Sequence, residues 1–188
     1  TPGLSRFRAE LLRVAAVFVS FQGFSRAAGG IVEAGKAVET ALQRFQAGTG
    51  SLKAAKDELE FTRQTAKDLK LEFQPLIKTY ARLVASSKNT ELEGQRTRNI
   101  FLGVATAARV MQLGADEVGG SIKALEQIIS KGRVSAEELR QQLGDRMTGA
   151  FQLFADGLGI STGKLDEMLK AGELTRESLV NFGDALLD

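Results

Sequence analysis

Apolar residues recur at alternating steps of three and four for more than four heptads in the middle of the chain. The stripe consists of Leu52, Ala55, Leu59, Thr62, Ala66, Leu69, Phe73, Leu76, Tyr80 and Leu83. This spacing lines one face of an α-helix and is typical of coiled coils. Pro75 removes one helix hydrogen bond, so we expect a kink or a break near Gln74, and the stripe staying in phase beyond it favours a kink. An antiparallel hairpin of two long helices would use the same stripe.

A similar stripe marks residues 4–28, where Leu4, Phe7, Leu11, Val14, Phe18, Phe21, Ser25 and Ala28 follow the same steps. Gly29 and Gly30 interrupt it, and a second helix is expected to run to about Phe45. The chain contains 20 glycines, which fall mainly between apolar-periodic segments. At such positions glycine is expected to end helices.

The last third of the chain repeats one type of helix start three times. An apolar residue precedes Ser or Thr, and Leu follows four residues later, at Val134-Ser135…Leu139, Ile160-Ser161…Leu165 and Leu174-Thr175…Leu179. The hydroxyl residue can cap the helix while the two apolar side chains close as a hydrophobic staple. Glu138 follows Ser135 by three residues and would complete a capping box. We therefore predict helices over about 135–156, 162–170 and 176–187.

The whole chain is predicted to be all-α, because no stretch alternates between apolar and polar residues as a strand does. A further capping box at 90–93 opens a helix that ends at Gly114, and another helix ends at Gly132. We expect two parts: a long-helix, coiled-coil-like region over 1–90 and a subdomain of short helices over 91–188. The charge changes at the same boundary, because residues 1–90 carry 14 Lys/Arg and 8 Asp/Glu, whereas 91–188 carry 11 and 15.

The composition argues against catalysis. The chain has no His and no Cys, which removes the commonest general base and the thiolate nucleophile. The glycines of the C-terminal part do not form a Gly-Lys-Ser/Thr phosphate loop. Asp145, Asp156, Asp166 and Glu167 lack the spacing of a calcium loop, and the last two fit the first turn of a helix. We predict a protein that is not an enzyme, with no catalytic, cofactor-binding or metal-binding residue and no cofactor.

The basic N-terminal half could approach nucleic acid, but its cations alternate with acids, which is typical of a solvated helix face. The longest charge-free run, from Val14 to Ser25, is too short to span a membrane, so no membrane span is expected. The chain begins with Thr1 rather than Met, and we expect it to be an excised segment of a longer protein or a processed product.

Residues 124–144, ALEQIISKGRVSAEELRQQLG, closely resemble the tape measure domain of the tail tape measure proteins of tailed phages and prophages. Shorter matches follow at 149–150, 159–161, 165–169 and 171–175, so the resemblance covers about the last 90 to 100 residues. Arg146, Met147 and Thr148 depart from the family, whose members carry a more apolar stretch there.

The resemblance implies a structural scaffold that guides assembly of the tail tube and sets the length of the tail. It also implies location in the lumen of the tail tube of the virion, after synthesis in the cytoplasm of the bacterial host. The implied partners are tail tube, tail assembly chaperone and tail-tip proteins. From the residues themselves we expect self-association through the heptad stripe and no specific binding of nucleic acid. The alternative function is a cellular helical adaptor that self-associates through a coiled coil.

Overall fold

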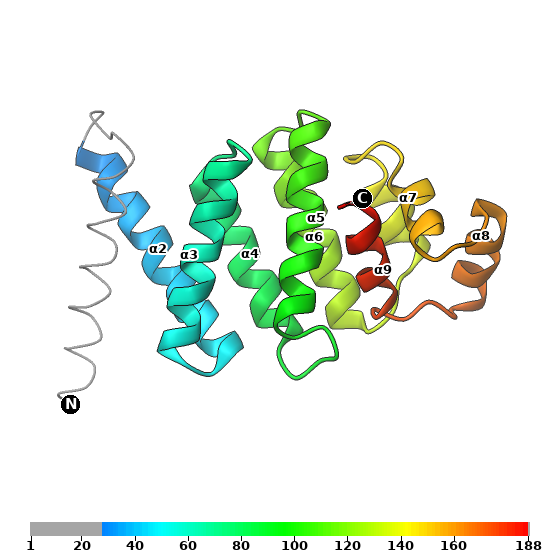
Figure 1. Cartoon of the computed structure of the whole chain (residues 1–188), viewed down its shortest axis with the longest axis horizontal. Coiled ribbons are helices and arrows are strands. Elements are labelled where there is room, and N and C mark those ends of the chain that lie inside the picture. Colours follow the sequence, from blue (N-terminus) through cyan, green and yellow to red (C-terminus); the bar gives the residue numbers. More distant parts are fainter. Residues whose placement is uncertain (1–27, 188) are drawn as a thin grey trace.

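A computed structural model describes residues 28–187, and this part of the chain is all-α, as predicted (Figure 1). Helices α2 (Ala28–Thr49), α3 (Leu52–Asp68), α4 (Phe73–Ser87), α5 (Gln95–Val110) and α6 (Ala115–Lys131) follow one another in alternating directions. Their connections are short, and a short connection turns a helix back beside the one before it. The first apolar stripe, apart from Ala28, lies outside the described residues.

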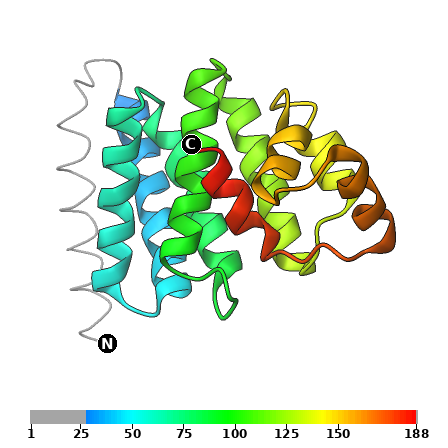
Figure 2. The same cartoon turned by 45° about the vertical axis from the view of Figure 1, so that its right-hand side comes forward.

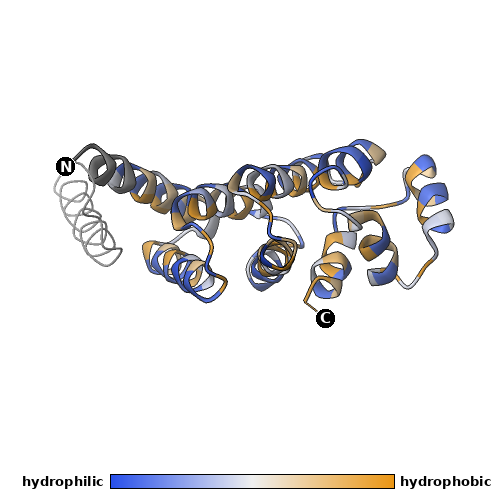
Figure 3. Cartoon of the chain, turned by 90° about the horizontal axis from the view of Figure 1, so that it is seen from above, coloured by the Kyte–Doolittle hydropathy of each residue, from blue (hydrophilic) through white to orange (hydrophobic). Residues whose placement is uncertain are grey.

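The helices form two rows. Helices α2, α4 and α6 make one row, and α3, α5 and α9 (Ser178–Ala185) make the other (Figure 3). Four aromatic rings from α2 to α5 meet between the rows, with the Tyr80 centroid 4.1 Å from that of Phe101 and 5.5 Å from those of Phe45 and Phe61. Such ring pairs add to the stabilisation from burial, so this cluster ties the two rows together.

The long stripe of residues 52–83 is divided between two helices. Helix α3 ends at Asp68 and α4 begins at Phe73, so the chain has a break at 69–72, shortly before Gln74, and the kink that the stripe favours is wrong. Lys70 has a φ of 54°, and the Leu71 N–H donates to the Ala66 carbonyl at 2.9 Å, which closes the end of α3. Pro75 is the third residue of α4, where a backbone N–H has no partner inside the helix, so proline fits there without bending it.

The stripe packs inside the chain. Eight of its ten residues are buried in the chain's own core: Ala55, Leu59, Thr62, Ala66, Phe73, Leu76, Tyr80 and Leu83. This arrangement corresponds to the hairpin alternative, since α3 and α4 pack against each other as well as against α2.

Glycine has two roles, of which the sequence indicated one. Gly132 and Gly172 end α6 and α8 (Thr162–Ala171) in the left-handed conformation, as predicted. Gly103 and Gly183 instead lie inside α5 and α9, where a Cβ at Gly103 would stand 2.6 Å from the Gly183 carbonyl oxygen. The missing side chains therefore let these two helices approach closely.

The expected single helix over 135–156 is wrong. The chain forms a π-helix η1 (Glu137–Leu143), a turn, and then α7 (Ala150–Gly157). The Gly144 N–H donates to the Leu139 carbonyl at 3.1 Å, the five-residue spacing of a π-helix. Gly149 has a φ of 85°, which stops the first segment from continuing into α7. Helix α8 agrees with its prediction, whereas α9 starts at Ser178, two residues later than expected.

The three helix starts differ in their polar contacts. Ser161 caps α8 as predicted, accepting from the Lys164 N–H at 3.2 Å. Ser135 instead donates its hydroxyl to the Glu138 carboxylate, so the reciprocal capping box is absent there. Thr175 pairs with Arg133 in an isolated antiparallel β-bridge, which is the one β-contact within residues 28–187.

One hydrophobic core joins all these elements. The buried apolar residues from Val38 on α2 to Phe182 on α9 belong to a single cluster of contacting side chains. Red helix α9 returns from the C-terminal helices to lie against green helix α5 (Figure 2). The boundary near residue 90 stays a prediction, and residues on both sides of it contribute to this core.

Candidate assembly surfaces and buried polar centres

A buried carboxylate joins α3, α4 and α5. Glu58 is 7% exposed and accepts from the Tyr80 hydroxyl at 2.6 Å and from the Arg98 Nε at 3.1 Å. The Arg98 guanidinium also lies 5.0 Å from the centroid of the Phe61 ring. Burial, followed by the neighbouring Glu58 charge, raises the pKa of Tyr80 far above its usual range. Tyr80 therefore remains a hydrogen-bond donor, and the cluster holds three helices in one register.

A second buried carboxylate joins α6 to η1. Glu138 has no exposed surface, and it accepts hydrogen bonds from the Lys131 ammonium and the Ser135 hydroxyl. Burial acts to raise the pKa of Glu138, but these two hydrogen bonds, a backbone hydrogen bond and the Lys131 charge together lower it below its usual value. The carboxylate is therefore charged at neutral pH and its partners are supplied by the chain.

Three of the four acidic residues considered as ligands have separate partners, and the fourth, Asp145, is exposed. Asp166 binds Lys170 at 2.6 Å and Arg140 at 2.7 Å, and hydrogen bonds from these two residues lower its pKa. Asp156 accepts from the Gln152 amide at 2.7 Å, and Glu167 pairs with Lys164. Within the described residues no group of three or more Asp and Glu side chains could hold a metal ion. These carboxylates fasten helices to one another or lie on the surface.

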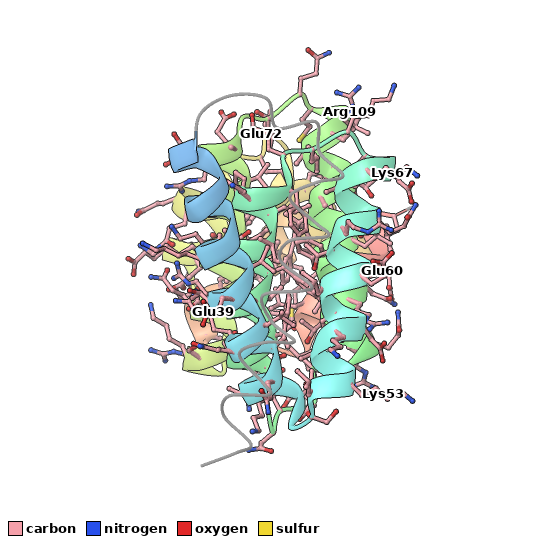
Figure 4. All side chains as sticks on the ribbon, turned by 90° about the vertical axis from the view of Figure 1, so that its left-hand side faces the viewer. Glu39, Lys53, Glu60, Lys67, Glu72 and Arg109 are labelled. Carbon is pink, nitrogen blue, oxygen red and sulfur yellow. The ribbon has the colours of Figure 1, made fainter. Side chains whose placement is uncertain are left out.

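The outer faces of α2 and α3 carry charges of both signs. Glu39, Lys53, Glu60 and Lys67 project from this end of the array (Figure 4). Glu60 accepts from the Arg63 Nε at 2.9 Å, and this hydrogen bond lowers the pKa of Glu60. Such alternation fits a solvated face. In the part of the chain that the structure covers, no helix is long and apolar enough to cross a membrane.

A cleft of about 300 Å³ lies between the turn that follows α3 and the turn that follows α5. The exposed Lys70, Glu72 and Arg109 line it together with Leu76 and Val118. Glu72 and Arg109 are labelled in Figure 4. The sequence did not indicate it, because the left-handed residues that shape these turns are Lys70 and Gln112 rather than glycine. The cleft is a candidate contact surface for a partner.

The structure thus defines a helical module whose buried polar groups hold helices together. The sequence model of the tape measure protein family matches residues 29–187, and the chain belongs to this family. It is 34% identical over 120 residues to a protein of Salmonella phage Felix O1 (isolate Felix O1-VT1) named a probable tape measure protein. That match covers 64% of this chain and 16% of the phage protein, so the chain spans about a sixth of that relative. No solved structure matches the chain.

Proposed function

We propose that this chain is a folded module of a phage tail tape measure protein, and that the parent protein guides tail tube assembly and sets tail length. Membership of the tape measure family supports this proposal. The role is structural rather than enzymatic, and the satisfied polar clusters around Glu58 and Glu138 support that choice.

The repeated reversal of the chain argues that this module is not itself the ruler. The longest described helix, α2, has 22 residues, which corresponds to about 33 Å at 1.5 Å per residue. The following helices fold back beside it instead of extending it. We therefore assign the measuring function to long helices elsewhere in the parent protein.

The proposed location is the lumen of the virion tail tube, after synthesis in the host cytoplasm. The proposed partners are the tail tube, tail assembly chaperone and tail-tip proteins. Self-association also remains a proposal, but most of the 52–83 stripe is buried within the chain. A second copy would therefore need another surface, such as the cleft between the α3 and α5 turns.

The proposal can be tested by in-frame deletions in the parent gene of the phage. Removing n residues from a long helical region outside this module should shorten the tail by about 1.5 Å per residue in negative-stain images. The matched deletion removes α8 (Thr162–Ala171) from the module, and any tails that assemble should keep the parental length. Unchanged tail length after the first deletion would refute the ruler role.

A titration with duplex DNA at low salt tests the nucleic-acid alternative. We expect no specific binding, because the cations on the α3 face are interleaved with acids. Salt-dependent binding at micromolar affinity would contradict this expectation.

A further inference from the structure

The helix pair α3–α4 and the helix pair α5–α6 have the same layout 42 residues apart. Shifting the bounds of α3, 52–68, by 42 gives 94–110, and α5 spans 95–110. The same shift moves α4, 73–87, to 115–129, and α6 spans 115–131. The agreement extends over both helices and over the connection between them.

The turns inside the two pairs are built in the same way. Lys70 and Gln112, 42 residues apart, have φ values of 54° and 56°, an uncommon conformation for residues other than glycine. The N–H of the next residue donates at 2.9 Å in both turns, from Leu71 to the Ala66 carbonyl and from Leu113 to that of Ala108. Equivalent positions therefore share a specific backbone geometry.

The side chains of the two pairs share part of their burial pattern, although the buried Phe73, Ile77, Ala81 and Val84 of α4 correspond to residues of α6 that are not buried. Buried residues at one position recur 42 residues later in the pairs Ala55/Thr97, Glu58/Ile100, Leu59/Phe101, Thr62/Val104, Ala66/Ala108, Leu76/Val118, Tyr80/Ile122, Leu83/Leu125 and Ser87/Ile129. Helix α2 fits the same scheme, because its buried Val38, Ala41 and Leu42 precede Tyr80, Leu83 and Val84 by 42. Two of these positions, Val38/Tyr80/Ile122 and Ala41/Leu83/Leu125, are therefore buried in all three helices of the row.

The pattern stops after α6. The 42-residue shift of α5 falls on 137–152, which holds η1, a turn and the start of α7. The place beside α5 in the second row is taken by α9, through the close approach of Gly103 and Gly183 (Figure 3). Helix α9 therefore closes the array on this side.

We propose that residues 28–131 form a repeat array of 42-residue helix-pair units, in which each unit presents a docking surface for another unit of the same kind. In such arrays each unit contacts its neighbours, so the array can lengthen by whole units. The contact between Glu58 and Arg98 joins successive units. The residue equivalent to Arg98 is Lys56, so an added unit would again offer a cation to Glu58.

The experiment duplicates one unit. A second copy of residues 52–93 is inserted after residue 93, which adds helices of 17 and 15 residues. The control inserts the same 42 residues with the two halves exchanged, 73–93 before 52–72, so length and composition are identical but helix order is broken. Hydrogen exchange measured by mass spectrometry reports on the inserted helices. We expect the backbone amides of the inserted helices to exchange at least tenfold more slowly in the duplication variant than in the control.

Equal exchange in the two insertions would overturn the proposal. A second variant tests equivalence without changing chain length, by replacing residues 67–72 with residues 109–114. Its matched control uses residues 108–113, one position out of register. We expect the melting temperature of the in-register variant to fall by no more than about 4 °C, the shift that about 1 kcal/mol produces at this chain length, and that of the control to fall further. Equal losses in both would also overturn the proposal.

Discussion

Removing Arg98 should destabilise the fold more than removing another arginine that pairs with a glutamate of α3. In Arg98→Met the methionine still covers Phe61, but Glu58 loses its cation while its side chain stays 9% exposed. Breaking a buried ion pair costs about 3–5 kcal/mol. Because Arg98 is 28% exposed and water can reach its side of the pair, we expect about 2–4 kcal/mol.

Urea unfolding followed by circular dichroism at 222 nm measures this loss. The control is Arg63→Met, because Arg63 pairs with Glu60 on the same helix but Glu60 is 56% exposed. Exposed pairs contribute about 0–1 kcal/mol, so the control should stay close to the natural chain. Adding Glu58→Gln to Arg98→Met should recover part of the loss, since the neutral amide needs no cation and can still accept from Tyr80. Equal losses in the two single variants would refute the reasoning.

Three further predictions concern packing and titration. Leu139→Ala should cost about 2–5 kcal/mol, because Leu139 is fully buried, and a melt identical to that of the natural chain would contradict this. Gly103→Ala should lower the free energy of unfolding by about 1–3 kcal/mol, because the added Cβ would push α5 away from α9. Gly119→Ala, whose Cβ would meet Thr79 at an ordinary 3.7 Å, is its control and should not destabilise; equal losses would refute the close-packing role. Tyr80 is the single tyrosine of a chain without tryptophan, and its raised pKa predicts stability that falls as pH rises above about 10, the pKa of an unfolded tyrosine. Tyrosinate absorbance near 295 nm should therefore appear together with alkaline unfolding, and a transition in the folded protein near pH 10 would contradict this.

The sequence predicts helices well here because their apolar faces repeat regularly. Eight of the ten residues in the stripe over 52–83 are buried, but the stripe leaves out six other buried residues of α3 and α4, among them Glu58 and Ile77. It does not locate the break between them, because Lys70 adopts a left-handed conformation that the sequence does not mark. Pro75 drew attention to the wrong position, since proline is compatible with the first turn of a helix.

Polar centres were harder to anticipate than helices. The sequence identified Ser135 and Glu138 as neighbours, but Lys131 completes their cluster only because η1 turns back against α6. Glu58 and Arg98 are 40 residues apart, and their contact depends on the packing of α3 beside α5. Contacts of this range follow from tertiary structure, whereas a cap such as that of Ser161 is local and could be predicted.

The β-bridge between Arg133 and Thr175 has a consequence for how the sequence of this protein could evolve. The Val134 N–H donates to the Leu174 carbonyl at 2.9 Å, and the Arg176 N–H donates to the Gly132 carbonyl at 3.2 Å. The segment between these two bridge residues contains η1, α7 and α8. Its two ends therefore lie side by side in the fold. Segments with adjoining ends tolerate insertion and exchange. Insertions are therefore best accommodated in exposed turns of this excursion, such as residues 171–173, whereas its buried residues, such as Leu139 and Phe154, belong to the shared core.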